Sequence, residues 1–498
     1  MCFVANMIMI TDIVLQMNNQ ILINMDGLFQ KFFAIHEYLE GNECSIEQPR
    51  RELCSQLISI QLFANFFYSI YLASLNGALN SKELREQQAH LKYVNAYIIE
   101  GYKALWGYKK NNKSLWGKFL EYYSSAKDTD NFDGIIQSIT NSLNAYKESD
   151  VTDKDERDLA MHYQLNKGGS PRELLKLDEI TIVKELERYK QFGDVFRSLI
   201  ECVTELINHY LFMKSDEEMM RVKPVLRPLT TLDQNVWKDK LEELDTRIIR
   251  NINYQSQNFS SCKEQLLKWP KIIKRIRDLY NININDYYDI LPTAEAMLAV
   301  SYMSLDLCAT IKRYFDSVIP IERAIALSRM NVICNTIIER VYGYTSRRGS
   351  YWERYLTKPY RGHELPSSLV EIKNIMDNSI SANLYSNEKR SAFVHLKKDN
   401  FITAIRFLYT QNPFEEIHNS IAIIKVLPKI QKAISDSLKQ IGDNIQARNA
   451  KKFIWVDRLI KQIEPHKDEP KMKGLYQSFL EMKKGNVLEA LESLRTMI

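Results

Sequence analysis

Residues 57–72 read LISIQLFANFFYSIYL, and this stretch decides the fold class. Its apolar side chains recur with the 3.6-residue period of a helix, and they do not alternate with the period of two that a strand requires. Apolar residues occupy almost every position, which is typical of a helix that is buried on most of its surface. The stretch therefore predicts a helix in the core of the protein.

The same period recurs along the chain, whereas sustained alternation is hard to find. Glycine and proline number only 16 and 13 among 498 residues, about half their share in an average soluble chain. That composition argues against sandwiches, barrels and the glycine-rich turns of α/β folds, so the predicted class is all-α. The other helical stretches are Leu84 to Leu105, Ile180 to Leu211, Ala294 to Tyr314, Ile321 to Val341, Phe401 to Leu408 and Ile430 to Ile441.

Composition and charge exclude several classes of protein. A hydrophobic share of 45% and a charged share of 26% fit a globular chain and exclude disordered or collagen-like ones. The 67 basic and 62 acidic residues leave a net charge of only +5, so any site for a polyanion must be local. The seven cysteines are scattered without metal-ligand spacing, which predicts reduced thiols, no metal site and no cofactor.

The sequence also predicts a cytoplasmic protein with no membrane contact. The apolar opening from Met1 to Met9 has no basic flank and is cut short by Asp12, so we do not expect a signal peptide there. Instead we expect an N-terminal helix that continues through Leu39. No uninterrupted apolar run approaches the ~20 residues that span a bilayer.

An internal repeat gives the domain organisation. At an offset of 236 residues, Leu91 to Asn95 aligns with Leu327 to Asn331, and Trp106 to Tyr108 aligns with Tyr342 to Tyr344. Two unrelated helical stretches that share chance aromatics are the alternative. We interpret the order-preserving matches as a tandem duplication that predicts two helical bundles paired as a pseudo-dimer. The predicted segments are an N-terminal helical segment (1–44), a first bundle (45–210), a helical connector (211–289), a second bundle (290–440) and a C-terminal helical tail (441–498).

One short motif occurs at equivalent places in both repeats. It is an arginine followed five residues later by a histidine, Arg157 with His162 and Arg390 with His395, at the nearby offset of 233. An arginine offers a permanent cation for a phosphate, and a histidine can transfer a proton near neutral pH. Five residues turn a helix by about 500°, so one straight helix does not aim both side chains at one atom. Two facing copies could build one site, or each arginine could instead pair with a carboxylate while the histidines fill packed positions.

The repeated Arg-x4-His motif in helical bundles resembles the HEPN superfamily. Ribonucleases of that superfamily carry Arg-x4-6-His and form one composite site between two HEPN domains. The resemblance implies that Arg157, His162, Arg390 and His395 are catalytic. The residue after the arginine is usually Asn, Asp or His in the family, which Asp158 fits and Ser391 does not. Many prokaryotic members act in abortive infection, so the resemblance also implies a toxin or antiviral defence role.

Two basic and aromatic stretches are candidates for RNA binding. Residues 340–361 hold six cations against the single acid Glu353, and residues 104–125 hold four cations against Glu121. Cations beside aromatic rings suit single-stranded RNA, because cations follow the backbone and rings stack on bases. The aromatics could equally be core residues beneath a solvated face. The residues predicted to bind RNA are Arg347, Arg348, Arg354, Lys109, Lys110 and Lys113.

These observations predict a metal-independent endoribonuclease. In the mechanism implied by the resemblance, His162 or His395 assists attack of the ribose 2'-hydroxyl on phosphorus, while Arg157 and Arg390 stabilise the developing charge. RNA is the expected partner, together with a possible protein partner or inhibitor. The competing interpretation is a non-enzymatic helical adaptor or RNA-binding scaffold.

Overall fold

The computed structural model describes most of the chain. The described residues are 2–42, 44–107, 114–126, 132–147, 154–163, 171–212, 222–229, 234–280, 290–343, 350–357, 360, 364–381, 387–394, 400–452, 454–487, 489–490 and 493.

The described residues form helices and their connections, without a strand, which confirms the all-α class. The first half contains α1 (Cys2–Glu40), α2 (Gln48–Asn80), α3 (Leu84–Leu105), α4 (Leu115–Ala126), α5 (Asp133–Lys147), α6 (Lys154–His162), the 3-10 helix η2 (Pro171–Glu179), α7 (Ile182–Ile207) and the π-helix η3 (Asn208–Phe212). The second half contains α9 (Gln234–Tyr280), α11 (Ile290–Asp316), α12 (Pro320–Ile337), the π-helices η4 (Ile338–Tyr342) and η5 (Trp352–Leu356), α13 (Ser367–Ser381), α14 (Asn387–Val394), α15 (Asn400–Thr410) and α16 (Pro413–Lys452). The tail contains α17 (Val456–Ile463), the 3-10 helix η7 (Glu464–His466) and α18 (Pro470–Lys484).

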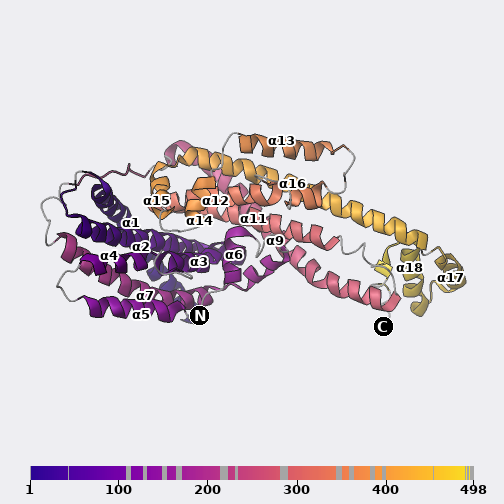
Figure 1. Cartoon of the computed structure of the whole chain (residues 1–498). Coiled ribbons are helices and arrows are strands. Elements are labelled where there is room, and N and C mark those ends of the chain that lie inside the picture. Colours follow the sequence, from indigo (N-terminus) through magenta and orange to yellow (C-terminus); the bar gives the residue numbers. More distant parts are fainter. Residues whose placement is uncertain are drawn as a thin grey trace.

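The molecule is elongated, and the first half of the chain forms one end of it (Figure 1). Here α2 is the central helix, with α1, α3, α4 and α7 packed around it. The predicted helix at residues 57–72 lies inside α2, and Leu57, Leu62 and Phe63 are completely buried. Helix α1 contributes Leu22 and Phe29 to the same core, so the N-terminal segment packs as part of this end.

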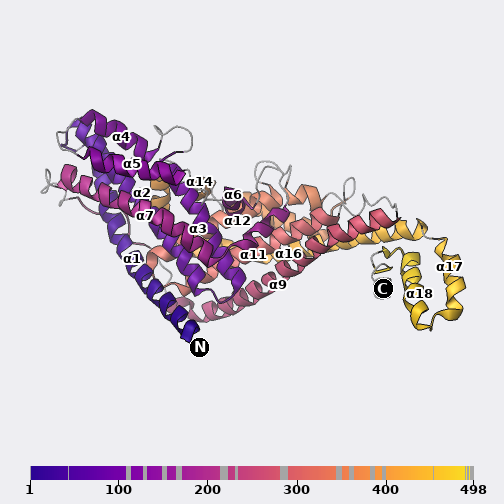
Figure 2. The same ribbon diagram turned by 90° about the horizontal axis from the view of Figure 1, so that it is seen from below.

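The second half of the chain surrounds α11 in the same way. Helices α9, α12 and α16 pack on α11, whose Leu298, Met303 and Leu307 are completely buried. The predicted connector therefore contributes α9 to this second core. Figure 2 shows α1 and α9 as the two edges of a V, one along each half. The predicted domain boundaries themselves stay a prediction.

Each core also includes short helices from the other half of the chain. The first core contains Phe393 of α14 and Phe401 of α15. The second core contains Leu159 of α6, Tyr163 just beyond it and Leu174 of η2. Because each half buries apolar side chains of the other, the two cores stabilise each other. The motif helices α6 and α14 lie at this mutual contact.

The central helices α2 and α11 are also the most apolar long helices among the described residues. By length and composition, Gln48–Asn80 and Leu291–Asp316 could each cross a membrane, but 89% and 83% of their most apolar windows are buried inside the protein. That burial is what the central core helix of a soluble protein shows.

The helices α17 and α18 form the other end of the molecule, where α16 extends beyond the second core (Figure 1). Helix α18 packs against α16 through its end at Gly485. Gly485 has a left-handed φ of 85°, and a Cβ there would lie 1.9 Å from the carbonyl oxygen of Gln446. Only glycine permits both the turn and this close approach.

Candidate functional site

Helix α6 carries the first motif and places Arg157 in buried ion pairs. Nη1 of Arg157 donates to Oε1 of Glu100 on α3 at 2.6 Å, and Nη2 pairs with Oδ1 of Asp158 at 2.8 Å. The residue is only 8% exposed. Two carboxylates therefore neutralise the guanidinium that the sequence suggested for a phosphate. This arrangement matches the alternative in which the arginine pairs with a carboxylate.

A second set of ion pairs fixes α6 to α7. Nη1 and Nη2 of Arg188 donate to Oε1 and Oε2 of Glu156 at 2.7 and 3.0 Å, in the parallel geometry typical of strong arginine–carboxylate pairs. The same Nη1 donates to Oε1 of Glu185 at 2.5 Å. Burial, and then the charge of Glu156, raise the pKa of Glu185 to about 8. Two glutamates thus share one arginine at the start of the motif.

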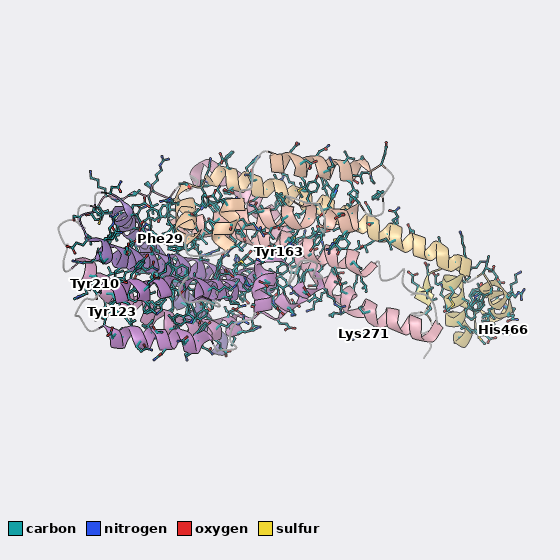
Figure 3. The ribbon with its side chains drawn as sticks, viewed as in Figure 1. Phe29, Tyr123, Tyr163, Tyr210, Lys271 and His466 are labelled. Atoms are coloured by element: carbon teal, nitrogen blue, oxygen red, sulfur yellow. The ribbon has the colours of Figure 1, made fainter. Side chains whose placement is uncertain are left out.

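The first motif ends where α6 ends, at His162. The next residue, Tyr163, has a φ of 52° and is the one non-glycine residue with positive φ in the described part of the chain. Its ring is buried in the second core, and its hydroxyl donates to Oδ2 of Asp306 on α11. Tyr163 lies near the middle of the elongated molecule (Figure 3). The backbone turn and the buried hydroxyl together fix the position of partly exposed His162.

Asp306 is the centre of a buried polar cluster that joins the two halves. Besides Tyr163, it pairs with Nζ of Lys92 on α3 at 2.5 Å and accepts the hydroxyl of Tyr93 at 2.8 Å. Nζ of Lys92 also lies 4.4 to 5.0 Å from the ring centres of Tyr163, Tyr93 and Tyr302. Burial lowers the pKa of Lys92, and the Asp306 carboxylate opposes that shift. The carboxylate and the three rings offset the cost of burying the ammonium.

The end of the first motif meets the second half at Arg340. Nε of Arg340, on η4, donates to the backbone carbonyl of His162 at 2.9 Å. The neighbouring Glu339 pairs through Oε2 with Nη2 of Arg390, the arginine of the second motif, at 2.9 Å. Burial lowers the pKa of Arg340, while the nearby charge of Glu339 opposes the shift and that of Arg390 adds to it. The structure thus brings His162 and Arg390 to adjacent residues of η4.

Arg390 is less enclosed than Arg157. Its side chain is 17% exposed, against 10% for that of Arg157. In addition to Glu339, its Nε donates to Oγ1 of Thr336 on α12 at 3.3 Å. His395 lies outside the described residues.

Most of the predicted RNA-binding residues also lie outside the described residues, namely Arg347, Arg348, Lys109, Lys110 and Lys113. Arg354 is described, lies on η5 and is exposed. The aromatics between these cations are mostly core residues: Trp106, Trp116, Phe119, Tyr342, Tyr351 and Trp352 are buried. Rings with their faces packed inside the protein cannot stack on bases, so the core interpretation of these aromatics is the correct one.

Sequence reasoning missed the cluster around Asp306 and counted Arg340 only as one cation in a run. One signal for the cluster was present. Asp306 is the single charged residue between Leu298 and Ile311, and an isolated charge inside a buried helix needs a partner. Nothing in the sequence identifies that partner as Lys92, because the pairing depends on how the two halves pack.

A metal centre and a polar cavity are two alternative kinds of site. In the described part of the chain, no three His, Cys, Asp or Glu side chains gather to hold a metal ion. A polar cavity of about 670 Å³ lies between α1, α2, α4 and α15, lined by residues that include His36, Arg51 and Lys118. None of the residues predicted for catalysis or RNA binding lines it. The candidate site is therefore the contact between α6, η4 and α14.

Compared with known proteins, the chain matches no family model, no curated protein and no solved structure.

Proposed function

We propose that this chain is a tandem HEPN-like protein that acts in the cytoplasm as a metal-independent endoribonuclease. The defence or toxin role of many HEPN proteins is part of the proposal. RNA is the proposed substrate, with a neutralising or activating protein as a further partner and no membrane contact. The observation that carries the proposal is the contact at η4, where Arg340 binds the carbonyl of His162 and Glu339 binds Arg390.

The order of helices supports a duplication. Helix α2 ends at Asn80 and α11 at Asp316, and α3 begins at Leu84 and α12 at Pro320, both at the offset of 236 found in the sequence. The motif helices α6 and α14 begin at Lys154 and Asn387, at the offset of 233. Unrelated helical stretches have no reason to keep this spacing.

The contacts between the halves support a pseudo-dimer. Helix α3 packs on α11, and α2 packs on α12; likewise η2 packs on α11, and α15 packs on α2. If α11 and α12 are the repeats of α2 and α3, each contact has its mirror partner. Reciprocal contacts of this kind are typical of a two-fold interface.

The motif arginines occupy equivalent surroundings. Arg157 binds Glu100, and Arg390 binds Thr336, which is the residue 236 positions after Glu100. This correspondence supports the proposed repeat, although the partner of the arginine has changed from a carboxylate to a hydroxyl.

The proposed reaction needs a proton acceptor and a cation beside one phosphate. His162 or His395 takes the proton of the ribose 2'-hydroxyl, whose oxygen forms a bond to phosphorus while the bond to the 5'-oxygen breaks and that oxygen takes up a proton. Arginines at the contact stabilise the charge on the phosphoryl oxygens. The products are a 2',3'-cyclic phosphate end and a 5'-hydroxyl end.

The test is incubation of purified protein with mixed cellular RNA in excess chelator, beside the His162→Ala/His395→Ala double variant. We expect cleavage by the wild type and loss of cleavage in the double variant. Undiminished cleavage in the double variant would exclude the HEPN mechanism.

A second candidate function is a non-enzymatic adaptor, and one observation favours it. Ile454 and Trp455, at the turn between α16 and α17, are 71% and 55% exposed at the projecting end of the molecule. Exposed large apolar side chains suit a protein partner. Absence of cleavage by wild-type protein under every RNA and activating condition would favour this adaptor.

A further inference from the structure

Both motif arginines already have partners in the structure. Arg157 is held by Glu100 and Asp158, and Arg390 is held by Glu339 and Thr336. A phosphate would therefore have to share either guanidinium with a carboxylate that is already bound to it. For Arg157 the competition is severe, because Glu100, with a side chain only 7% exposed, would be separated from its guanidinium partner.

Arg340 differs from both. Its Nε is bound by the carbonyl of His162, and within the described residues its two terminal nitrogens have neither a hydrogen bond nor an ion pair. A guanidinium that is fixed through Nε holds its Nη groups in a defined direction. That arrangement leaves two parallel donors for a planar, bidentate acceptor such as a phosphate.

The position of Arg340 is the second argument. It touches the end of the first motif directly, and its neighbour Glu339 touches the arginine of the second motif. Glu339 forms its ion pair with Arg390, and no carboxylate among the described residues forms an ion pair with Arg340. An anion bound to Arg340 would lie beside the chain segment that positions His162.

We propose that Arg340 is the residue that binds the phosphate of single-stranded RNA at this site, an assignment that rests on the function proposed above. Arg157 then acts as a positioning residue that fixes α6 on α3, and Arg390 positions η4 through Glu339.

The competing role for Arg340 is structural. The carbonyl of His162 is one of the last of α6, and a cation there satisfies a helix end. Arg51 offers a matched control, because its guanidinium donates to the backbone carbonyls of Leu39 and Gly41 at the end of α1. Arg51 therefore binds the end of a helix as Arg340 does, and it lies far along the chain from both motifs.

The experiment measures binding of a single-stranded RNA 20-mer whose 2'-oxygens are methylated, so that the nucleophile is blocked and binding is separated from cleavage. Affinity is measured over a series of salt concentrations for wild type, Arg340→Gln, Arg340→Lys and Arg51→Gln. Loss of one phosphate contact lowers the slope of log K against log salt by about 0.7. We expect that loss in Arg340→Gln and the wild-type slope in Arg51→Gln.

The lysine variant keeps the test informative if Arg340→Gln fails to fold. Lysine retains the charge but lacks the planar fork, so we expect a wild-type slope, weaker affinity and cleavage of unmodified RNA reduced by about tenfold or more. For Arg340→Gln we expect cleavage reduced by about 10²- to 10³-fold.

Three outcomes would overturn the assignment. A folded Arg340→Gln variant with the wild-type salt slope would reduce Arg340 to a capping residue while leaving the ribonuclease proposal intact. Wild-type affinity and cleavage in Arg340→Lys would likewise reduce Arg340 to a capping residue and leave the ribonuclease proposal intact. Wild-type protein that neither binds nor cleaves RNA would remove the proposed function, and the assignment with it.

Discussion

The two motif helices, α6 and α14, have the same place in their halves but dock by different chemistry. On α6, Glu156 faces Glu185 of α7, and Arg188 lies between the two carboxylates. On α14 the corresponding position is Lys389, which pairs directly with Glu416 of α16 at 2.8 Å. On α6 two negative charges lie together, and a third residue, Arg188, is needed to neutralise them. On α14 one cation binds one carboxylate in a simple ion pair.

The difference extends to the motif arginines. Arg157 is enclosed by carboxylates on its own helix and on α3, whereas Arg390 is bound by a hydroxyl and by the half-exposed Glu339. The ion pairs that dock α6 are thus more deeply buried than those that dock α14. We infer that α6 holds the site in place and that α14 contributes the adaptable side.

The largest expected effect concerns catalysis by the two motifs. We expect His162→Ala to lower RNA cleavage by roughly 10²- to 10⁴-fold, the usual contribution of a positioned general acid or base. The effect of His395→Ala should be smaller, because the first motif has Asp158 and its arginine forms the more deeply buried ion pairs. Single-turnover cleavage of a defined RNA measures both.

The control for this prediction is His466→Ala, since His466 lies at the far end of the molecule (Figure 3). It should cleave like the wild type. Equal losses in both motif variants, with no further loss in the double variant, would indicate one composite site whose members act as a unit. A larger loss in His395→Ala would contradict the ranking of the motifs.

The next effect concerns the cluster that joins the halves. Asp306→Asn keeps the shape of the side chain but leaves buried Lys92 without a counter-charge, and Lys92 is completely buried. We expect the free energy of unfolding to fall by about 3–5 kcal/mol. Urea denaturation measures it.

The double variant Lys92→Met/Asp306→Asn is the control, because it removes the unpaired charge. It should be more stable than Asp306→Asn alone, since the two positions are coupled. Additive losses would show that the ion pair does not hold the halves together.

A third prediction compares the arginines directly. Arg157→Ala removes a buried partner of Glu100 and should cost about 2–3 kcal/mol, with Lys103 limiting the loss because its Nζ also pairs with Glu100 at 2.8 Å. Arg390→Ala removes a more exposed pair and should cost about 1 kcal/mol or less. Urea denaturation of both variants checks the order. A larger loss in Arg390→Ala would contradict the view that buried ion pairs hold α6 in place more strongly than α14.

Much of the fold could be predicted from the sequence. The apolar period identified the helices around Leu57 to Leu72 and Ala294 to Tyr314, because a buried helix leaves a local pattern. The exchange of short helices between the cores could not be predicted, since Leu159 and Phe393 are apolar wherever they pack. Their partners depend on contacts between residues more than a hundred positions apart.

The candidate site could be predicted only in part. Repetition singled out Arg157 and Arg390, but their ion pairs depend on Glu100 and Glu339, which no spacing rule connects to them. Arg340 lies in a run of cations that look alike in the sequence. Arg340 is distinguished by one hydrogen bond to a backbone carbonyl. Every residue has such a carbonyl, so the sequence cannot show which one an arginine will bind.

The smallest expected effect is a pH dependence that separates the two docking arrangements. Burial and the charge of Glu156 raise the pKa of Glu185 to about 8, from an ordinary value of 4.5. Between these values the folded protein holds a proton that the unfolded chain has lost, so the stabilising contribution of this group is complete below pH 4.5 and is lost as the pH rises to 8. Glu185→Gln removes this loss. We therefore expect the variant to gain stability relative to wild type when urea denaturation at pH 8 is compared with pH 5.5.

The matched control is Glu416→Gln on the other side of the comparison. It breaks the pair with Lys389, so it should destabilise the protein without a gain at pH 8. If Glu185→Gln showed the same difference from wild type at both pH values, Glu185 would be ionised in the folded protein throughout this range. Arg188 and Lys184, which pairs with Glu156 at 3.2 Å, would then neutralise both glutamates. The contact between the two glutamates would in that case not destabilise the docking of α6 relative to that of α14.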